Sequence, residues 1–165
     1  MYELVAQFPS IRRSTVVFVR AGATLARVSG ELHFVKDIRL VIRERILYHR
    51  LPAVIDWYGY EVWQGAEKLY WYDSQPHPND SALQSSHPHH KHIPPDIKHN
   101  RIPAPEMSFT RPNLSALIQE IETFGAGRGL ALRAPRTAYD ELYAAYQQVC
   151  RSLRKLYHTL NRPKG

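Results

Sequence analysis

The sequence contains one cysteine, Cys150, and no long run of apolar residues. A lone cysteine cannot form an internal disulfide, which excludes a disulfide scaffold and favours a reducing compartment. A membrane-spanning helix needs about 20 predominantly apolar residues, so none is expected. The first residues also lack the basic and apolar segments of a secretory signal. These absences predict a soluble, cytoplasmic protein that does not contact a membrane.

Acidic residues are scarce, with 15 Asp and Glu against 22 Lys and Arg, giving a formal net charge of +7. Nine histidines can add positive charge where the surroundings favour protonation. A positive field attracts acidic partners, and both a nucleic-acid backbone and an acidic protein fit this description. Net charge alone does not choose between RNA and a protein partner.

Residues 14–72 are rich in β-branched and aromatic residues and show no helical period. Apolar and polar residues alternate in Thr24–Val28, Glu31–Val35 and Ile38–Leu47, with turns expected at Gly22 and Gly30. Val54–Trp63 and Lys68–Tyr72 are joined by a short Gly-containing connection, which predicts a hairpin. The pattern favours an antiparallel meander of about five to six strands. Its aromatic residues are expected to form either a cross-strand core or an exposed platform for bases.

Residues 76–112 contain eight of the twelve prolines and six of the nine histidines. Proline removes a backbone donor and biases the residue before it towards extended conformations. We therefore expect a long loop without regular structure, crossing one face of the sheet. A loop of this length in a compact domain is more often functional or disordered than idle.

Two helices are predicted after this loop. Asn113 is expected to cap the first, which ends at Gly125 and carries apolar residues at helical spacing: Leu114, Leu117, Ile118, Ile121 and Phe124. The second runs from Thr137 to about Leu160, with an apolar stripe suited to docking or to dimerisation through a coiled-coil seam. The predicted fold class is therefore α+β, with one helix docked on the sheet. Residues 1–132, including the His-rich loop 76–112, form the main domain, and residues 133–165 form a helical extension of the same compact unit.

The segment His87–His92 places four imidazoles within six residues. Neutral imidazole binds Zn²⁺, Ni²⁺ or Cu²⁺, but no cysteine pair or helical H-E-x-x-H motif frames the cluster, so a divalent metal is the less favoured interpretation. The same histidines suit proton transfer at a ribose 2′-hydroxyl or a leaving 5′-oxygen, because their usual pKa lies near neutrality. A third interpretation has them hydrogen-bonding backbone groups that the prolines leave without partners.

Two further groups of polar residues have alternative interpretations. Asp73 can orient the imidazole of His77, or it can form an Asx turn that redirects the chain. The last helix ends in a basic cluster that either contacts phosphates or forms a solvated face near the helix C-terminus: Arg151, Arg154, Lys155 and Arg162.

Two motifs carry a resemblance to a known family. Trp71–Asn79 contains an aromatic-Tyr-Asp turn followed by Pro-His, and Pro88–His92 reads Pro-His-His-Lys-His. In these motifs, and in the helix opening at Asn113, the chain resembles the TumE family of prokaryotic toxin-antitoxin toxins. The resemblance implies a small toxin silenced by a neighbouring antitoxin, usually a DNA-binding protein, and it implies no particular mechanism. The C-terminal extension departs from the family pattern, so it is a candidate for antitoxin binding or dimerisation.

The sequence therefore predicts a TumE-like toxin that acts on RNA as a metal-independent ribonuclease without a cofactor. The candidate catalytic residues are His89, His90, His92, Lys91, Arg101, Asp73 and His77. Candidate nucleic-acid contacts are Lys98, Arg151, Arg154 and Lys155. The alternative is a non-catalytic module that binds nucleic acid or an acidic partner through the same loop and the last helix.

Overall fold

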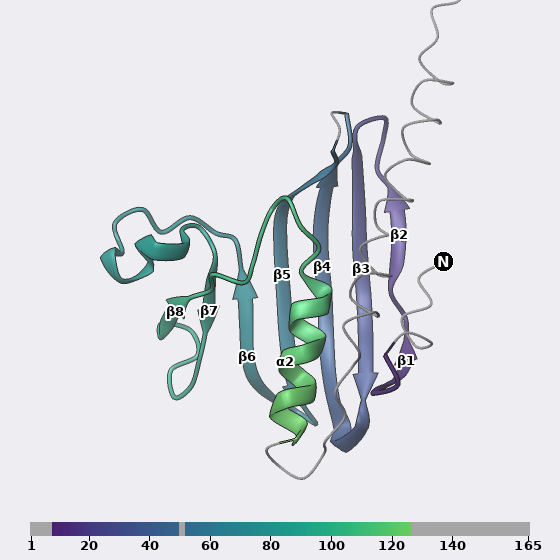
Figure 1. Cartoon of the computed structure of the whole chain (residues 1–165), viewed down its shortest axis with the longest axis vertical. Helices are drawn as coiled ribbons and strands as arrows, with labels where there is room; N and C mark the ends of the chain where they lie inside the picture. Colours follow the sequence, from purple (N-terminus) through teal and green to yellow (C-terminus); the bar gives the residue numbers. More distant parts are fainter. Residues whose placement is uncertain (1–7, 50–51, 127–165) are drawn as a thin grey trace, which may run out of the picture.

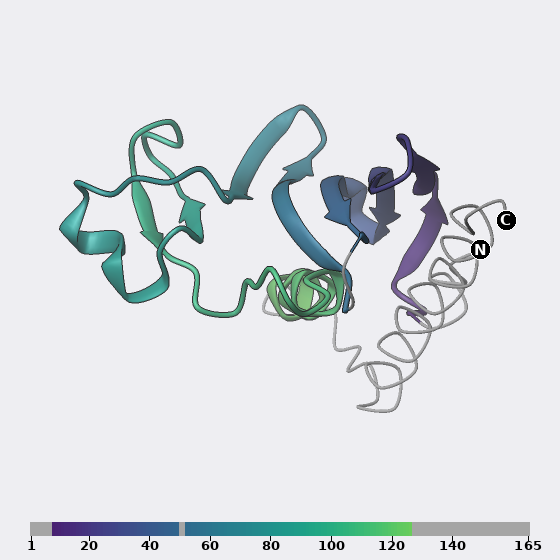
Figure 2. The same cartoon turned by 90° about the horizontal axis from the view of Figure 1, so that it is seen from above.

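The computed structural model describes residues 8–49 and 52–126. Within these residues the chain forms one eight-stranded antiparallel sheet in the order β1-β3-β4-β5-β6-β7-β8, with β2 also paired to β3. One helix, α2 (Leu114–Ala126), lies on a face of the sheet (Figures 1 and 2). The strands are β1 (Ile11–Ser14), β2 (Val17–Arg20), β3 (Leu25–Phe34), β4 (Ile38–Leu47), β5 (Val54–Gln64), β6 (Glu67–Asp73), β7 (His90–His92) and β8 (Arg101–Pro103). The α+β class and the docked helix are confirmed, while the predicted number of strands was too small.

Strands β3 to β6 form the predicted meander. Their alternation places Ile38, Leu40 and Ile42 on the buried side, since successive residues of a strand point to opposite faces. The β5–β6 hairpin also follows the prediction, with Gln64 paired to Glu67 and Gly65 in the turn at φ 58°. A positive φ is readily adopted by glycine, which explains why the tight turn forms there.

Gly30 does not form the predicted turn, because β3 continues through it. Its φ is +142°, and a Cβ at this position would lie 2.5 Å from the Thr15 carbonyl oxygen. The Thr15 N–H donates to the Glu31 carbonyl at 2.9 Å, and the Glu31 N–H donates to Thr15 Oγ1 at 2.9 Å. Glycine thus allows the connection between β1 and β2 to lie directly against β3, and both short strands pair along one edge of β3.

The apolar core lies between the sheet and α2. Leu117, Ile118 and Ile121 of the helix are buried in the same cluster as the inward-facing residues of β3 to β6. The four tyrosines of the predicted aromatic hairpin belong to this core, which confirms the packing interpretation for them: Tyr58, Tyr60, Tyr70 and Tyr72. Trp63 and Trp71 are only half-buried. The predicted aromatic cluster is therefore divided, with its tyrosines in the core.

The helix predicted after Asn113 is confirmed, although the role of the Asn113 side chain differs from a simple cap. Its carbonyl accepts the N–H of Leu117 at 3.2 Å, as expected for the residue that precedes a helix. The side-chain amide instead donates to the Tyr60 hydroxyl at 3.0 Å and accepts the Ser108 N–H at 2.9 Å. The second predicted helix lies outside the described residues, as do the proposed extension 133–165 and Cys150. Among the described helices, none is long and apolar enough to cross a bilayer.

Residues 74–113 differ most from the prediction of an irregular loop across a sheet face. They contain a 3-10 helix, η2 (Ser81–Ser86), and the short strands β7 and β8, which extend the sheet beyond β6 (Figure 1). Side chains supply the hydrogen bonds that these short elements lack. The Ser86 hydroxyl donates to the His89 carbonyl at 2.7 Å and accepts the Ala104 N–H at 2.8 Å. Proline-rich sequence therefore did not prevent strand formation here, because polar side chains tie the segment together.

Candidate functional site

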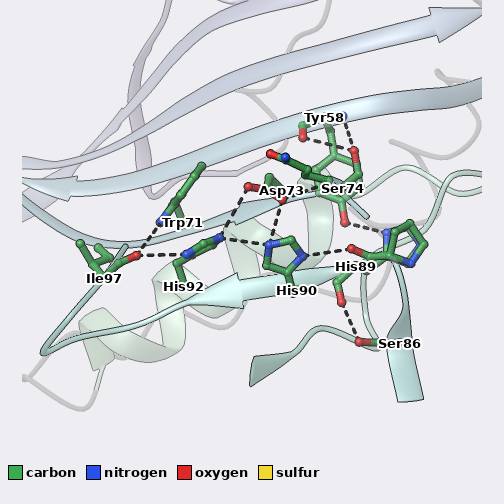
Figure 3. Close-up of polar contacts among 11 residues, drawn as sticks. Tyr58, Trp71, Asp73, Ser74, Ser86, His89, His90, His92 and Ile97 are labelled. Atoms are coloured by element: carbon green, nitrogen blue, oxygen red, sulfur yellow. Dashed lines mark hydrogen bonds and ion pairs between the residues drawn. The ribbon is translucent and has the colours of Figure 1, made fainter. Parts of the chain in front are cut away.

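The pairing of β6 with β7 brings three of the predicted catalytic residues together. Asp73 lies opposite His90, and Trp71 lies opposite His92. Since residues alternate along a strand, His90 and His92 point to one face and Lys91 to the other. Figure 3 shows the side chains of Asp73, His90 and His92 pointing toward one another. We call these three residues the buried centre.

The buried centre is compact and closed to solvent. His90 Nε2 lies 3.0 Å from His92 Nε2 and 3.0 Å from Asp73 Oδ1, and His92 Nε2 lies 3.6 Å from Asp73 Oδ2. The exposed fractions are 1% for His90, 3% for His92 and 7% for Asp73. Ionisable side chains are rarely buried to this degree unless they pair with one another or with an ion.

Backbone carbonyls fix the orientation of both imidazole rings. His90 Nδ1 lies 3.0 Å from the Pro88 carbonyl oxygen, and His92 Nδ1 lies 3.1 Å from the Ile97 carbonyl oxygen (Figure 3). A carbonyl oxygen can only accept a hydrogen bond, so each Nδ1 carries the proton. In both rings Nδ1 bonds to a backbone carbonyl, as one interpretation expected, while the two Nε2 atoms converge, as the other expected.

The charges of the centre are strongly coupled. Burial raises the pKa of Asp73, but hydrogen bonds with His90 and His92 and from the Gln75 N–H outweigh it and hold that pKa well below its usual value. Burial lowers the pKa of His90, while the hydrogen bond to Asp73 raises it, and the net shift is upward. The Asp73 carboxylate is therefore ionised, and it favours positive charge on the imidazole side.

The Gln75 N–H donates to Asp73 Oδ1 at 2.9 Å. This contact is the Asx turn proposed from the sequence as the alternative role of Asp73. Asp73 thus both redirects the chain after β6 and contacts the two histidines.

His77 and Arg101 lie beside the buried centre, and we call them the rim. The His77 ring contacts the His90 ring edge-on, with centroids 4.8 Å apart. Arg101 pairs with His92 across β7 and β8, and both rim residues are half-buried. Burial and the positive charge of Arg101 lower the pKa of His77. Arg101 Nε is buried and has no hydrogen-bond partner within residues 8–49 and 52–126.

Trp71 belongs to the site, although sequence reasoning did not assign it there. Its ring stacks on His92 with centroids 4.1 Å apart and an interplanar angle of 28°. Its Nε1 donates to the Ile97 carbonyl at 3.1 Å, the same oxygen that His92 Nδ1 contacts. The signal for Trp71 was its spacing on the predicted strand, since Trp71 and Asp73 lie two residues apart and therefore point to the same face.

Other predicted residues lie elsewhere. His89 Nδ1 lies 2.7 Å from the Tyr58 hydroxyl, and the His89 ring packs against Phe109 in place of the centre. Lys91 points to the helix-covered face, where its ammonium pairs with the Glu120 carboxylate of α2. Lys98 is exposed in the connection between β7 and β8. Arg151, Arg154 and Lys155 lie outside the described residues, and the roles predicted for all these side chains stay predictions.

The donor set of the centre also matches that of a metal site. Two imidazole nitrogens and one carboxylate oxygen lie within 4.8 Å of one another. Of the four clustered histidines considered from sequence, only His90 and His92 take part, and Asp73 supplies the third donor.

The fold and the buried centre define a small α+β protein with a cluster of ionisable side chains near one edge of its sheet. The family model described as Toxin TumE matches residues 1–124, and the chain belongs to that family. It is therefore a toxin of a toxin-antitoxin system, whose partner is a cognate antitoxin. The match ends before the predicted extension 133–165. No curated protein and no solved structure matches the chain.

Proposed function

We propose that this toxin cleaves RNA and that the buried centre and its rim carry the reaction. The observation that supports this proposal most is the convergence of the Asp73 carboxylate with His90 Nε2 and His92 Nε2, next to the half-buried imidazole of His77 and the guanidinium of Arg101. Carboxylate, imidazole and guanidinium groups are the side chains that phosphodiester cleavage uses for proton transfer and charge stabilisation.

The proposed reaction is attack of a ribose 2′-hydroxyl on the adjacent phosphorus. The O2′–P bond forms, the P–O5′ bond breaks, one proton leaves the 2′-hydroxyl and one proton reaches the departing 5′-oxygen. Imidazole can perform both transfers. In this reaction Arg101 stabilises negative charge on the phosphate, and Asp73 orients the histidines. The products are a 2′,3′-cyclic phosphate and a 5′-hydroxyl.

The rim is the side from which a phosphate would approach, since the centre itself is buried. His77 and Arg101 are the half-buried members of the site. The Nε of Arg101 has no hydrogen-bond partner among the described residues, and it belongs to a guanidinium, a group that binds phosphate through paired N–H donors. We assign contact with the phosphate to Arg101 and proton transfer at the substrate to His77. Asp73, His90 and His92 are buried behind them, where they position His77 and set the charge around it.

A row of cations and indole rings beside Trp71 supports RNA as the substrate. Lys68 Nζ lies 5.3 Å from the Trp71 ring and 4.8 Å from the Trp63 ring, and the Arg39 guanidinium lies 5.4 Å from Trp63. Alternating aromatic and basic groups bind single-stranded nucleic acid by stacking and by phosphate contact. The same row of side chains would also suit the alternative, a binding module without catalysis. A measurement of RNA cleavage is therefore needed to distinguish the two functions.

The experiment is expression of the full chain with and without its antitoxin. We expect growth arrest and fragmented RNA from the chain alone, and recovery of both when the antitoxin is present. His90→Ala and His92→Ala should abolish arrest, whereas His99→Ala should not, because His99 is exposed and pairs only with Asp96 among the described residues. Growth arrest with intact RNA, at confirmed expression, would reject RNA cleavage and favour binding alone.

A further inference from the structure

The orientation of the two buried imidazoles calls for a cation, either a proton or a metal ion, between their Nε2 atoms and Asp73. Both Nδ1 atoms donate to carbonyl oxygens, so a neutral ring presents the lone pair of its Nε2 to this space, and only a protonated ring can donate from Nε2. The two Nε2 atoms are 3.0 Å apart, and the Asp73 carboxylate faces them. Two lone pairs and an anion at this separation repel one another unless a cation lies among them.

The spacing of the three donors fits a metal ion. Zinc binds imidazole nitrogen and carboxylate oxygen at roughly 2.0 to 2.2 Å, so donors at angles near 90 to 110° lie about 3.0 to 3.5 Å apart. The two Nε2 atoms are 3.0 Å apart, Asp73 Oδ1 lies 3.0 Å from His90 Nε2, and the other oxygen, Oδ2, lies 3.6 Å from His92 Nε2. With one donor atom from each residue, all three donors lie within 4.8 Å of one another. A single ion can therefore contact both nitrogens and one carboxylate oxygen after a small adjustment of the side chains.

The groups behind the donors are those that support metal ligands. A ligating histidine normally donates its other N–H to a carbonyl or a carboxylate, which fixes the ring and raises its basicity. The Pro88 and Ile97 carbonyls do this for His90 and His92, and the Gln75 N–H holds Asp73 at 2.9 Å. Stacking on Trp71 holds the His92 ring from its face.

We propose that Asp73, His90 and His92 bind one divalent transition-metal ion of the zinc type. Two imidazoles favour zinc, cobalt, nickel or iron over magnesium and calcium, which prefer all-oxygen sites. Three protein ligands leave a coordination position for water or for an oxygen of the substrate. The proposal departs from the sequence-based expectation of a metal-independent centre, which lacked both the position of Asp73 and the orientation of the rings. With an ion bound at both Nε2 atoms, His90 and His92 act as ligands, and the neighbouring His77 is the imidazole left for proton transfer. The proposal concerns binding and holds whether or not the centre cleaves RNA.

The test uses the purified full chain after treatment with a chelator. We expect calorimetric titration with Zn²⁺ to show one ion bound per chain and the thermal midpoint to rise, while Mg²⁺ does neither. Titration with Co²⁺ should quench part of the tryptophan fluorescence, since Trp71 stacks directly on His92. Trp71→Phe should lose most of that quenching and keep the stoichiometry, which links the signal to this site.

Ligand variants separate this site from adventitious binding at other histidines. Asp73→Asn and His90→Ala should weaken Zn²⁺ binding by more than a hundredfold, since even groups behind the ligands change metal affinity by roughly 10- to 100-fold. His99→Ala, which removes an exposed imidazole, should bind as the unaltered chain does. His92→Gln, compared by circular dichroism, serves where an alanine variant does not fold.

Two outcomes overturn the proposal. One is a folded chain that takes up no Zn²⁺ or Co²⁺, which would leave a proton as the cation between the histidines and Asp73. The other is unchanged uptake by a folded His90→Ala, His92→Gln double variant, which would place the ion elsewhere. If the chain cleaves RNA but binds no metal, the metal site is rejected and the proposed function stands. If the chain binds metal but does not cleave RNA, the proposed function is rejected and the metal site stands.

Discussion

The meander β3–β6 and the segment 74–113 build one sheet by different means. The strands of the meander have seven to eleven residues, and its buried positions are almost all apolar. Strands β7 and β8 have three residues each, and β7 buries two histidines. The meander is held by apolar burial, whereas the segment is held by side-chain hydrogen bonds and an ion cluster. The apolar core and the cluster of ionisable side chains therefore lie in different regions, which meet where Asp73 of β6 faces His90.

Substitution of two neighbouring histidines should separate loss of activity from loss of stability. His90→Ala should reduce RNA cleavage by about a hundredfold or more, the usual loss when a proton-transfer or metal-binding group is removed. His89→Ala should cost stability instead, about 1 to 3 kcal/mol, because it leaves the buried Tyr58 hydroxyl without its partner. Cleavage rates and urea unfolding, measured for both variants, would show that His90 affects activity and His89 affects stability. Equal losses of activity in two folded variants would contradict it.

A core truncation in the meander should have the largest effect on folding. Leu40 is fully buried, and Leu40→Ala should lower the free energy of unfolding by about 2 to 5 kcal/mol through lost burial and a residual cavity. Val19 is 53% exposed, so Val19→Ala serves as a control with an expected change below about 1 kcal/mol. Denaturant titration measures both variants. A small effect at Leu40 would show that the meander core is not the source of stability.

Glu44 provides a pH-dependent test of the same core. Burial raises its pKa from 4.5 to about 7, against the opposing effect of the hydrogen bond from Tyr60. Between these pH values the folded chain holds a proton that the unfolded chain releases, so stability is greatest at low pH and falls as pH rises through 7. Relative to Glu44→Gln, the unaltered chain should lose about 3 kcal/mol of unfolding free energy from pH 4 to pH 8. A pH-independent difference between the two would reject this account of Glu44.

The ion pair that joins β7 to α2 should contribute least to the free energy of unfolding. Lys91 pairs with Glu120, and its ammonium also lies 3.9 Å from the centroid of the Tyr70 ring. A double-mutant cycle with Lys91→Met and Glu120→Gln should give a coupling of about 0.5 to 1 kcal/mol, as for partly exposed ion pairs. Lys91→Met should retain RNA cleavage, because Lys91 points away from the buried centre. If a folded Lys91→Met variant lost RNA cleavage, Lys91 would have to be counted among the catalytic residues, as the sequence predicted.

The sequence predicted the meander well because burial there follows the strand period. Ile38, Leu40 and Ile42 alternate with half-buried residues as their spacing indicates. The exception was Gly30, where the glycine serves a close backbone approach instead of a turn. Sequence shows that a glycine is present, but it does not distinguish these two uses.

The candidate site was predicted in part. Asp73, His77, His90, His92 and Arg101 were chosen for their chemistry, and the structure brings all five together. The geometry was not predictable, because it depends on the β6–β7 register, and proline-rich sequence gave no sign of a strand. His89 and Lys91 have the same chemistry as their neighbours, yet their positions in the chain direct them to Tyr58 and Glu120.

If the toxin acts through the buried centre, the purified Asp73→Asn variant should lose most of its activity. The substitution keeps the size of the side chain and removes the charge that faces His90 and His92. With equal circular dichroism, the unaltered chain should cleave RNA at least about a hundredfold faster than the variant. A folded Asp73→Asn variant that cleaves RNA at the unaltered rate would contradict the account.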